Sequence, residues 1–198
     1  MKWAMAWVYI GVFAFGGIIC TPILLRVNPD IVTERLRLRK GAGKQRDVLL
    51  ASMMGAFWVC GFLTAGVDRR FCWSPVVPPA VQLAGVAIMG GGYLVGVWAM
   101  AVNRFFAWFV RIQEDRGHRA ITTGPYRFVR HPGYLGGIAM MIATPVILGS
   151  LWAFIPMGVA ICFLVVRTAV EDSTLQKELD GYGDFARRVR YRLLPGVW

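Results

Sequence analysis

Three long apolar runs constrain the fold of this 198-residue chain more than any other feature. Residues 4–25, 48–67 and 76–102 carry no charged side chain, and each is close to or longer than the ~20 residues that cross the hydrocarbon core of a bilayer. Lipid offers no hydrogen-bond partner to the backbone, so such segments must be helical. The chain is 57% hydrophobic and 17% charged, whereas soluble domains are about a quarter charged. We therefore predict an all-α integral membrane protein.

Two shorter apolar runs, residues 134–149 and 151–166, meet at the turn signal Leu-Gly-Ser. At about 1.5 Å per residue each reaches roughly 24 Å, slightly less than the hydrocarbon core. We predict a tight helical hairpin that just spans, which gives about five transmembrane helices; a re-entrant hairpin is the alternative. After the last run, residues 167–179 should continue the helix, "DGYGD" should end it, and a second short basic piece should lie on anionic headgroups.

The net charge of +11 is distributed by loop. Seven basic residues lie in 26–47, six in 103–133 and six in the tail from Arg167, but only two in 68–75. The positive-inside rule predicts that the first three segments are cytoplasmic and that 68–75 is outside. The N-terminus is then outside and the C-terminus cytoplasmic, as expected for a bacterial inner-membrane protein. Because topology explains the basic excess, we expect no nucleic-acid partner.

The remaining composition suggests one domain, residues 1–198. The first apolar run lacks the basic flank of a signal peptide. The four cysteines include no CxxC pair, so neither a metal site nor a disulfide framework is indicated. Gly92 with Gly96 and Gly133 with Gly137 form GxxxG patterns. Close helix packing explains the first pair, whereas for the second pair a ligand is as good an explanation as packing. Most polar residues gather in 103–133 and 167–198, on the predicted cytoplasmic face.

The stretch "RHPGY" opens the fourth apolar run. Pro132 suits the first turn of a helix, which places His131 at the cap. The N–H groups of Gly133, Tyr134 and Leu135 would then be free at the positive end of the helix dipole, and Arg130 adds charge. The pattern predicts an anion site at the membrane surface, although the same side chains could simply anchor the helix in headgroups.

A second charged stretch, "RTAVED", ends the fifth apolar run. Arg167 and Glu171 are four residues apart on one helix face, with Asp172 beside them, so a local ion pair is one interpretation. Charged groups next to the bilayer are costly and usually functional. A carboxylate facing the anion site would suit a zwitterionic ligand.

Together these stretches resemble the isoprenylcysteine carboxyl methyltransferase and phospholipid methyltransferase superfamily. The superfamily pattern H-x-L-x-x-x-G-x-Y, R-H-P-x-Y-x-G and E-E is matched over residues 80–198, with Ile121 displaced by one position and Asp172 in place of the second glutamate. The resemblance implies S-adenosylmethionine as cofactor and a lipophilic methyl acceptor, with 103–133 and 167–198 forming a cytoplasmic cofactor-binding cap. It implies a cofactor site made of His118, Ile121, Gly124, Tyr126, His131, Pro132, Gly133, Tyr134, Leu135, Glu171 and Asp172.

The expected chemistry is methyl transfer at the inner leaflet to an isoprenylcysteine-like carboxylate, a lipid amine or a thiol. Arg167 could orient an anionic acceptor, and Glu171 or Tyr126 could deprotonate an amine. Two alternatives remain. The ending "YRLLPGVW" resembles NADPH-dependent sterol reductases, and a non-enzymatic membrane adaptor would have no cofactor pocket.

Overall fold

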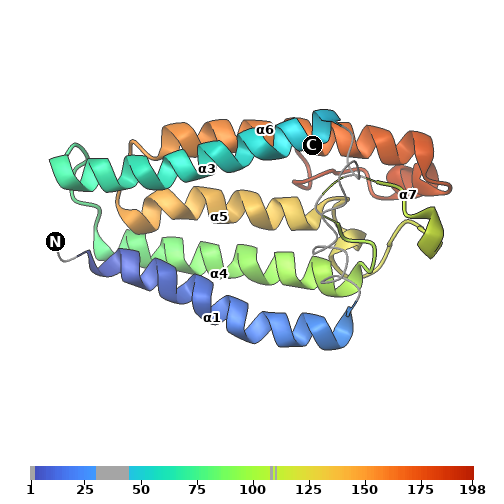
Figure 1. Cartoon of the computed structure of the whole chain (residues 1–198), viewed down its shortest axis with the longest axis horizontal. Coiled ribbons are helices and arrows are strands. Elements are labelled where there is room, and N and C mark those ends of the chain that lie inside the picture. Colours follow the sequence, from blue (N-terminus) through green and yellow to red (C-terminus); the bar gives the residue numbers. More distant parts are fainter. Residues whose placement is uncertain (1–2, 30–44, 108, 110) are drawn as a thin grey trace.

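The computed structural model describes residues 3–29, 45–107, 109 and 111–198. Five long helices run side by side along the molecule: α1 (Ala4–Val27), α3 (Gln45–Phe71), α4 (Pro79–Val102), α5 (Pro132–Leu148) and α6 (Phe154–Glu178) (Figure 1). The short helix α7 (Tyr182–Arg188) and the 3-10 turns η1 (Glu114–Arg116) and η2 (Gly124–Arg127) lie at one end of this bundle. The described part of the chain contains no strand, which confirms the all-α prediction.

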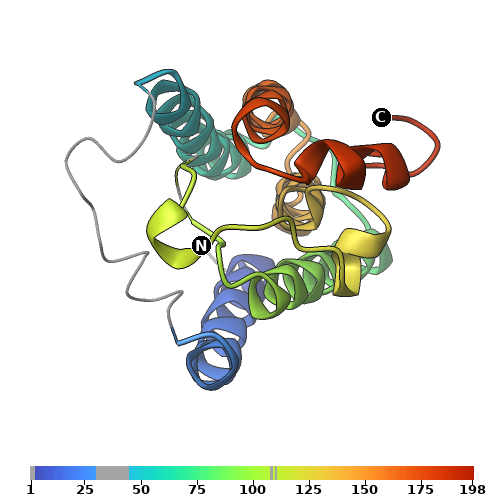
Figure 2. The ribbon, with the colours of Figure 1, turned by 90° about the vertical axis from the view of Figure 1, so that its right-hand side faces the viewer.

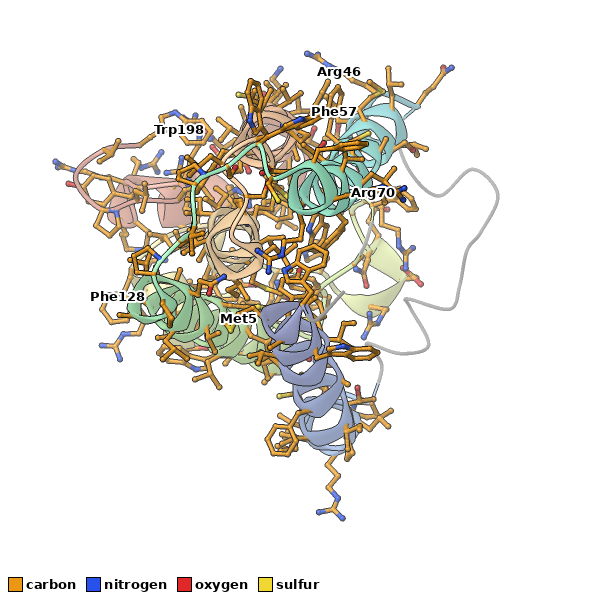
Figure 3. The ribbon with its side chains drawn as sticks, turned by 90° about the vertical axis from the view of Figure 1, so that its left-hand side faces the viewer. Met5, Arg46, Phe57, Arg70, Phe128 and Trp198 are labelled. Carbon is orange, nitrogen blue, oxygen red and sulfur yellow. The ribbon has the colours of Figure 1, made fainter. Side chains whose placement is uncertain are left out.

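Four of the helices, α1, α3, α4 and α6, are long and apolar enough to cross a membrane. Their outward faces carry large apolar side chains that would be unfavourable in water, such as Trp7 at 73% and Phe15 at 68% exposure. Figure 3 shows side chains of the surrounding helices pointing away from the bundle centre on all sides. Residues 30–44, which make up most of the basic segment predicted to be cytoplasmic, lie outside the described residues.

Helix α5 is the shortest of the five, with 17 residues, and lies in the middle. It packs against α1, α3, α4 and α6, and the end views show it surrounded by the others (Figures 2 and 3). The hairpin prediction holds at its turn, where Gly149 adopts a φ of 70° that a glycine tolerates best. Helix α5 begins two residues before the predicted apolar run, at Pro132, because the proline fits the first turn.

The tail follows the predicted order, with different boundaries. Helix α6 continues past the apolar run to Glu178, as expected, and α7 begins at Tyr182 within "DGYGD". The residues after α7 are largely exposed, but two of them are bound to the start of α5. The backbone N–H groups of Arg130 and His131 donate to the carbonyl oxygens of Tyr191 and Arg192, both at 2.9 Å. The tail is therefore attached to the start of α5.

Helices α4 and α5 pack closely through glycines. A Cβ built at Gly92 would lie 2.7 Å from the carbonyl oxygen of Gly136, and one at Gly136 would overlap the carbonyl oxygen of Gly92. The predicted role of Gly92 in close packing is confirmed. Its partner on α5 is Gly136, and a Cβ at Gly137 would make an ordinary contact of 3.7 Å with Leu164. The close contact fixes where α5 begins relative to α4, and hence the position of the "RHPGY" stretch.

Candidate functional site

A pocket lies at the end of the bundle that carries α7, η1 and η2. We call it the polar pocket. Its wall combines the segment after α4, the start of α5, the end of α6 and the region around α7. The lining residues are Asn103, Phe105, Phe106, Ala107, Phe109, Arg111, His118, Arg119, Ala120, Ile121, Tyr126, Arg130, His131, Gly133, Tyr134, Glu171, Leu175, Leu179, Tyr182 and Phe185.

The structure brings most of the predicted site residues into this wall and leaves others out. His118, Ile121, Tyr126, His131, Gly133, Tyr134 and Glu171 line the pocket. Gly124, Pro132, Leu135, Asp172 and Arg167 are not among its lining residues. Gly124 instead makes a turn with a φ of 58°, and a Cβ there would lie 2.9 Å from Val102. Gly124 therefore allows the backbone to turn beside α4 and does not line the pocket.

The start of α5 differs in one respect from the anion site that the sequence predicts. His131 is the N-cap residue and Pro132 follows it, as predicted. However, the N–H groups of Tyr134 and Leu135 both donate to the carbonyl oxygen of His131 at 3.1 Å. The prediction of three free donors is therefore wrong for two of them, because the first helical turn already uses them. Gly133 lies in the pocket wall, where Phe106 packs against it.

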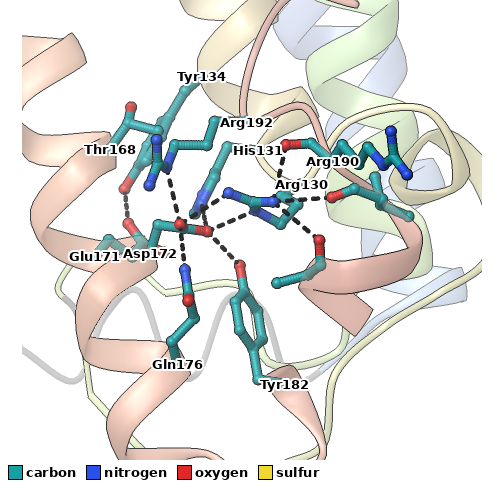
Figure 4. A network of polar contacts seen from close by, with 12 residues as sticks. Arg130, His131, Tyr134, Thr168, Glu171, Asp172, Gln176, Tyr182, Arg190 and Arg192 are labelled. Atoms are coloured by element: carbon teal, nitrogen blue, oxygen red, sulfur yellow. Dashed lines mark hydrogen bonds and ion pairs between the residues drawn. The ribbon is translucent and has the colours of Figure 1, made fainter. Parts of the chain in front are cut away.

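Asp172 is the centre of a buried hydrogen-bond network (Figure 4). The Arg130 guanidinium binds it with two bonds, Nε to Oδ1 at 2.7 Å and Nη2 to Oδ2 at 3.0 Å. His131, Gln176, Tyr182 and Arg192 of the described chain also contact this carboxylate, at 3.3, 2.7, 3.1 and 2.9 Å respectively. Asp172 is fully buried, with 0% exposure. We call these residues the Asp172 network.

The network joins the start of α5, the end of α6, α7 and the tail. Arg130 also donates from Nη1 to the carbonyl oxygens of Val189 and Arg190, at 2.9 and 3.0 Å. Burial is the main cause that raises the pKa of Tyr182, and the adjacent Asp172 carboxylate raises it further, so its hydroxyl donates. The sequence predicted Asp172 in the cofactor site, whereas the structure places its carboxylate behind the pocket wall, where it holds the wall together.

Glu171 and Tyr134 form the polar centre of the pocket wall. The Tyr134 hydroxyl donates to Oε2 of Glu171 (Figure 4). The Tyr134 ring is parallel to that of His131, with centroids 5.7 Å apart and 5° between the planes. The local Arg167–Glu171 pair that the sequence allowed is replaced: Arg167 binds Asp47 of α3, with Nε 2.7 Å from Oδ1. The carboxylate of Glu171 thus faces the pocket next to a hydroxyl donor.

Tyr126 is held by Asn103, whose Nδ2 donates to the phenol oxygen at 3.0 Å. Burial raises the pKa of Tyr126 far above its usual range; the Asn103 hydrogen bond lowers it in part, and the negative charge of Glu171 raises it again. At neutral pH the phenol keeps its proton. Tyr126 can therefore donate a hydrogen bond in the pocket but is poorly suited to take a proton from an acceptor.

His118 is held in one tautomer by its neighbours. The backbone N–H of Gln113 donates to its Nδ1 at 3.3 Å, and the Phe105 ring lies 4.5 Å away between centroids. Burial first, and then the positive charges of Arg111 and Arg116, together lower the pKa of His118 from 6.5 to about 4. The imidazole is therefore neutral at pH 7. With Nδ1 accepting, Nε2–H remains as a donor.

Several wall residues were not predicted from the sequence. Asn103, Phe105 and Phe106 follow α4 in the stretch "NRFFAWF", and Tyr182 and Phe185 belong to α7. The aromatic run immediately after an apolar segment was a usable signal for the first group. No sequence signal marks Tyr182 and Phe185, because only the folding of the tail brings them to the pocket.

The helical bundle with this polar site at one end defines an integral membrane protein with a binding pocket beside its apolar helices. The family model of phospholipid methyltransferases matches residues 81–181, about half of the chain. The chain therefore belongs to the phospholipid methyltransferase family, and the resemblance drawn from its sequence is confirmed. The matched segment contains every predicted site residue from His118 to Asp172 and excludes α1 and α3.

Curated relatives agree with this assignment over shorter stretches. Two rice proteins, from Oryza sativa subsp. indica and subsp. japonica, are each named probable protein-S-isoprenylcysteine O-methyltransferase and are 33% identical over 63 residues, 32% of this chain and 33% of theirs. Protein-S-isoprenylcysteine O-methyltransferase B of Arabidopsis thaliana is 29% identical over 93 residues, 46% of this chain and 47% of its own. The matches thus span about a third to a half of these relatives' length.

Proposed function

We propose that the protein transfers a methyl group from S-adenosylmethionine to a lipophilic acceptor at the membrane surface. The observation that carries this proposal is the position of the polar pocket. Glu171, Tyr134 and His118 line it at one end of an apolar bundle. A water-soluble methyl donor and a membrane-dissolved acceptor could both reach such a place. The methyltransferase family assignment supports the same reaction class.

The chemistry of the pocket wall fits the proposed cofactor. The Glu171 carboxylate can accept hydrogen bonds from an ammonium group or from ribose hydroxyls, and the cations Arg111 and Arg119 suit a carboxylate. Phe106 and Phe109 offer apolar contact for a purine ring. S-Adenosylmethionine, when bound, would supply an activated methyl group on a sulfonium.

The residues of the pocket would act mainly by positioning. Holding two reactants in line at near-attack distance removes several kcal/mol of the barrier, roughly 7–11 kcal/mol in the best cases. A carboxylate or thiolate acceptor needs no base. An amine acceptor must lose a proton, and Glu171 is the better candidate to take it, because the raised pKa keeps Tyr126 protonated.

We further propose that the acceptor is reached from the inner leaflet and that 103–133 and 167–198 are the cytoplasmic cofactor-binding cap. The names of the rice and Arabidopsis relatives make an isoprenylcysteine carboxylate the first acceptor to test. Lipid amines and thiols are the other two classes of acceptor to test.

The test combines binding and transfer. Calorimetry on the detergent-purified protein should show binding of S-adenosylhomocysteine and none of NADPH. Radiolabelled methyl transfer is then measured with isoprenylated cysteine analogues, total membrane lipids and small thiols in parallel. Binding of NADPH alone would favour the reductase class, and binding of neither would favour an adaptor. Labelling of one acceptor class identifies the substrate class.

A further inference from the structure

A buried ion pair joins α3 to α6 close to the polar pocket. Asp47, in the first turn of α3, is 1% exposed, and Arg167 of α6 is 4% exposed. The Arg167 guanidinium donates two hydrogen bonds to the Asp47 carboxylate, from Nε to Oδ1 at 2.7 Å and from Nη2 to Oδ2 at 3.4 Å. The partners are 120 positions apart in the sequence, so only the packing of α3 on α6 brings them together.

The pair reaches the pocket through one aromatic ring. The Arg167 guanidinium carbon lies 5.4 Å from the centroid of the Tyr134 ring. Tyr134 in turn donates its hydroxyl hydrogen bond to Glu171. Tyr134 and Glu171 line the pocket, whereas Asp47 and Arg167 do not. A continuous line of contacts therefore runs from α3 to the carboxylate that faces the pocket.

The geometry of the pair matters more than its strength. A buried ion pair is often no more stabilising than well-packed apolar residues of similar volume, because both charges lose their hydration. A two-bond contact between guanidinium and carboxylate does, however, fix the plane of the guanidinium. With its plane fixed, Arg167 supports the Tyr134 ring in one orientation, and the hydroxyl of that ring fixes Glu171.

We propose that Asp47 is a positioning residue for the polar pocket, acting through Arg167 and Tyr134 on Glu171. The inference rests on the proposed function, because it assigns Asp47 to the binding of the same cofactor. Asp47 lies outside residues 81–181, so helix α3 would contribute to the site although the family match does not include it.

The decisive variants separate positioning from folding. Asp47→Asn keeps the shape of the side chain but removes its charge. The double variant Asp47→Leu with Arg167→Met replaces the whole pair by apolar side chains and should keep the thermal midpoint close to that of the parent protein. The matched control is Asp184→Asn, which removes the carboxylate charge from an exposed pair with Arg187, where the side chains are 65% and 77% exposed.

Calorimetry with S-adenosylhomocysteine on the full-length, detergent-purified variants gives the readout. We expect both the single and the double variant to bind about tenfold more weakly than the parent, the loss expected for one misplaced charge-assisted hydrogen bond, and Asp184→Asn to bind like the parent. Asp47→Asn should also be coupled to Glu171→Gln: the double variant of these two should bind about as weakly as Glu171→Gln alone.

Two results would overturn the inference, and they differ from failure of the proposed function. If the apolar double variant keeps the parent's midpoint and its affinity, the pair is purely structural. If the losses from Asp47→Asn and Glu171→Gln simply add, Asp47 does not act on Glu171. Absence of binding by the parent protein would instead overturn the proposed function, and this inference with it.

Discussion

Two adjacent acidic residues, Glu171 and Asp172, differ completely in their surroundings. Successive residues on an α-helix point about 100° apart, so neighbours in sequence face different parts of the structure. Glu171 faces the polar pocket and accepts from Tyr134, whereas Asp172 is buried among five hydrogen-bonding side chains of the described chain. One carboxylate is available to a ligand and the other supports the wall. The two residues should therefore respond oppositely to substitution.

Glu171→Asp should weaken ligand binding without destabilising the protein. The change keeps the charge but withdraws the carboxylate by one methylene, and losing a charge-assisted hydrogen bond costs roughly 1.5–3 kcal/mol, or on the order of tenfold to a hundredfold in affinity. Calorimetry with S-adenosylhomocysteine and a thermal melt without ligand test both parts. Glu178→Asp, the same shortening two turns along the exposed side of α6, serves as control. Unchanged affinity in Glu171→Asp would remove Glu171 from the site.

Asp172→Asn should instead destabilise the protein. The substitution leaves the guanidinium groups of Arg130 and Arg192 without their carboxylate, and breaking a buried ion pair costs about 3 kcal/mol. The thermal midpoint in detergent should fall clearly, while the exposed Asp180→Asn should leave it unchanged. A variant as stable as the parent would show that the Asp172 network contributes little to folding.

At this scale the sequence predicts residue types better than contacts. The "RHPGY" stretch and Glu171 stand out in the sequence as chemically important, and the structure places five of these residues in one pocket wall: Arg130, His131, Gly133, Tyr134 and Glu171. The partners of Asp172 could not be predicted, because Tyr182 and Arg192 reach it only after the tail folds back. The partner of Arg167 lies 120 residues away, and no local spacing could indicate it.

At the scale of elements, the close contact between α4 and α5 offers the most direct test of the helix packing. Gly136→Ala should destabilise the protein by about 1–3 kcal/mol, because the new methyl group would overlap the Gly92 carbonyl oxygen and force the helices apart. Gly137→Ala is the matched control, since its Cβ would make an ordinary 3.7 Å contact with Leu164. Thermal unfolding in detergent measures both. Equal midpoints for the two variants would contradict the close approach.

The segment that carries His118 should be sensitive to acid. Its pKa is lowered from 6.5 to about 4, so between these values the unfolded chain binds more protons than the folded one and stability falls as pH falls. The stabilisation is fully present above pH 6.5. We expect the thermal midpoint of the parent to drop more steeply from pH 7 to pH 5 than that of His118→Gln, which cannot titrate. Parallel profiles would show that His118 does not contribute.

The boundaries of helices could be predicted where the end of an apolar run or a proline marks them. The Leu-Gly-Ser turn and Pro132 locate the α5–α6 hairpin to within a few residues. The segment from Asn103 to His131 was not predictable in detail, because its course follows from specific contacts such as those of Asn103 and Gln113 and not from a repeating pattern.

At the scale of the whole molecule, the orientation in the membrane remains a prediction. The 72–78 connection lies at the opposite end of the bundle from α7 (Figure 1), and α7 contributes to the wall of the polar pocket. Charge distribution predicts that the pocket end is cytoplasmic. In a background without the other cysteines, native Cys72, which is exposed, should react with an impermeant thiol reagent from outside. Glu114→Cys should react only from the cytoplasm, and labelling of both from one side would rule out five spans.

The Asp172 network also sets an order of events during synthesis. Its members come from the start of α5, the end of α6, α7 and the tail, so the earliest and latest are separated by more than sixty positions, from Arg130 to Arg192. Chains emerge from the ribosome N-terminus first, and folding follows that order. The long helices can therefore enter the membrane while the pocket wall is still incomplete. We therefore expect the wall of the proposed site to be complete only after Arg192 has been added, so that membrane insertion precedes the acquisition of binding.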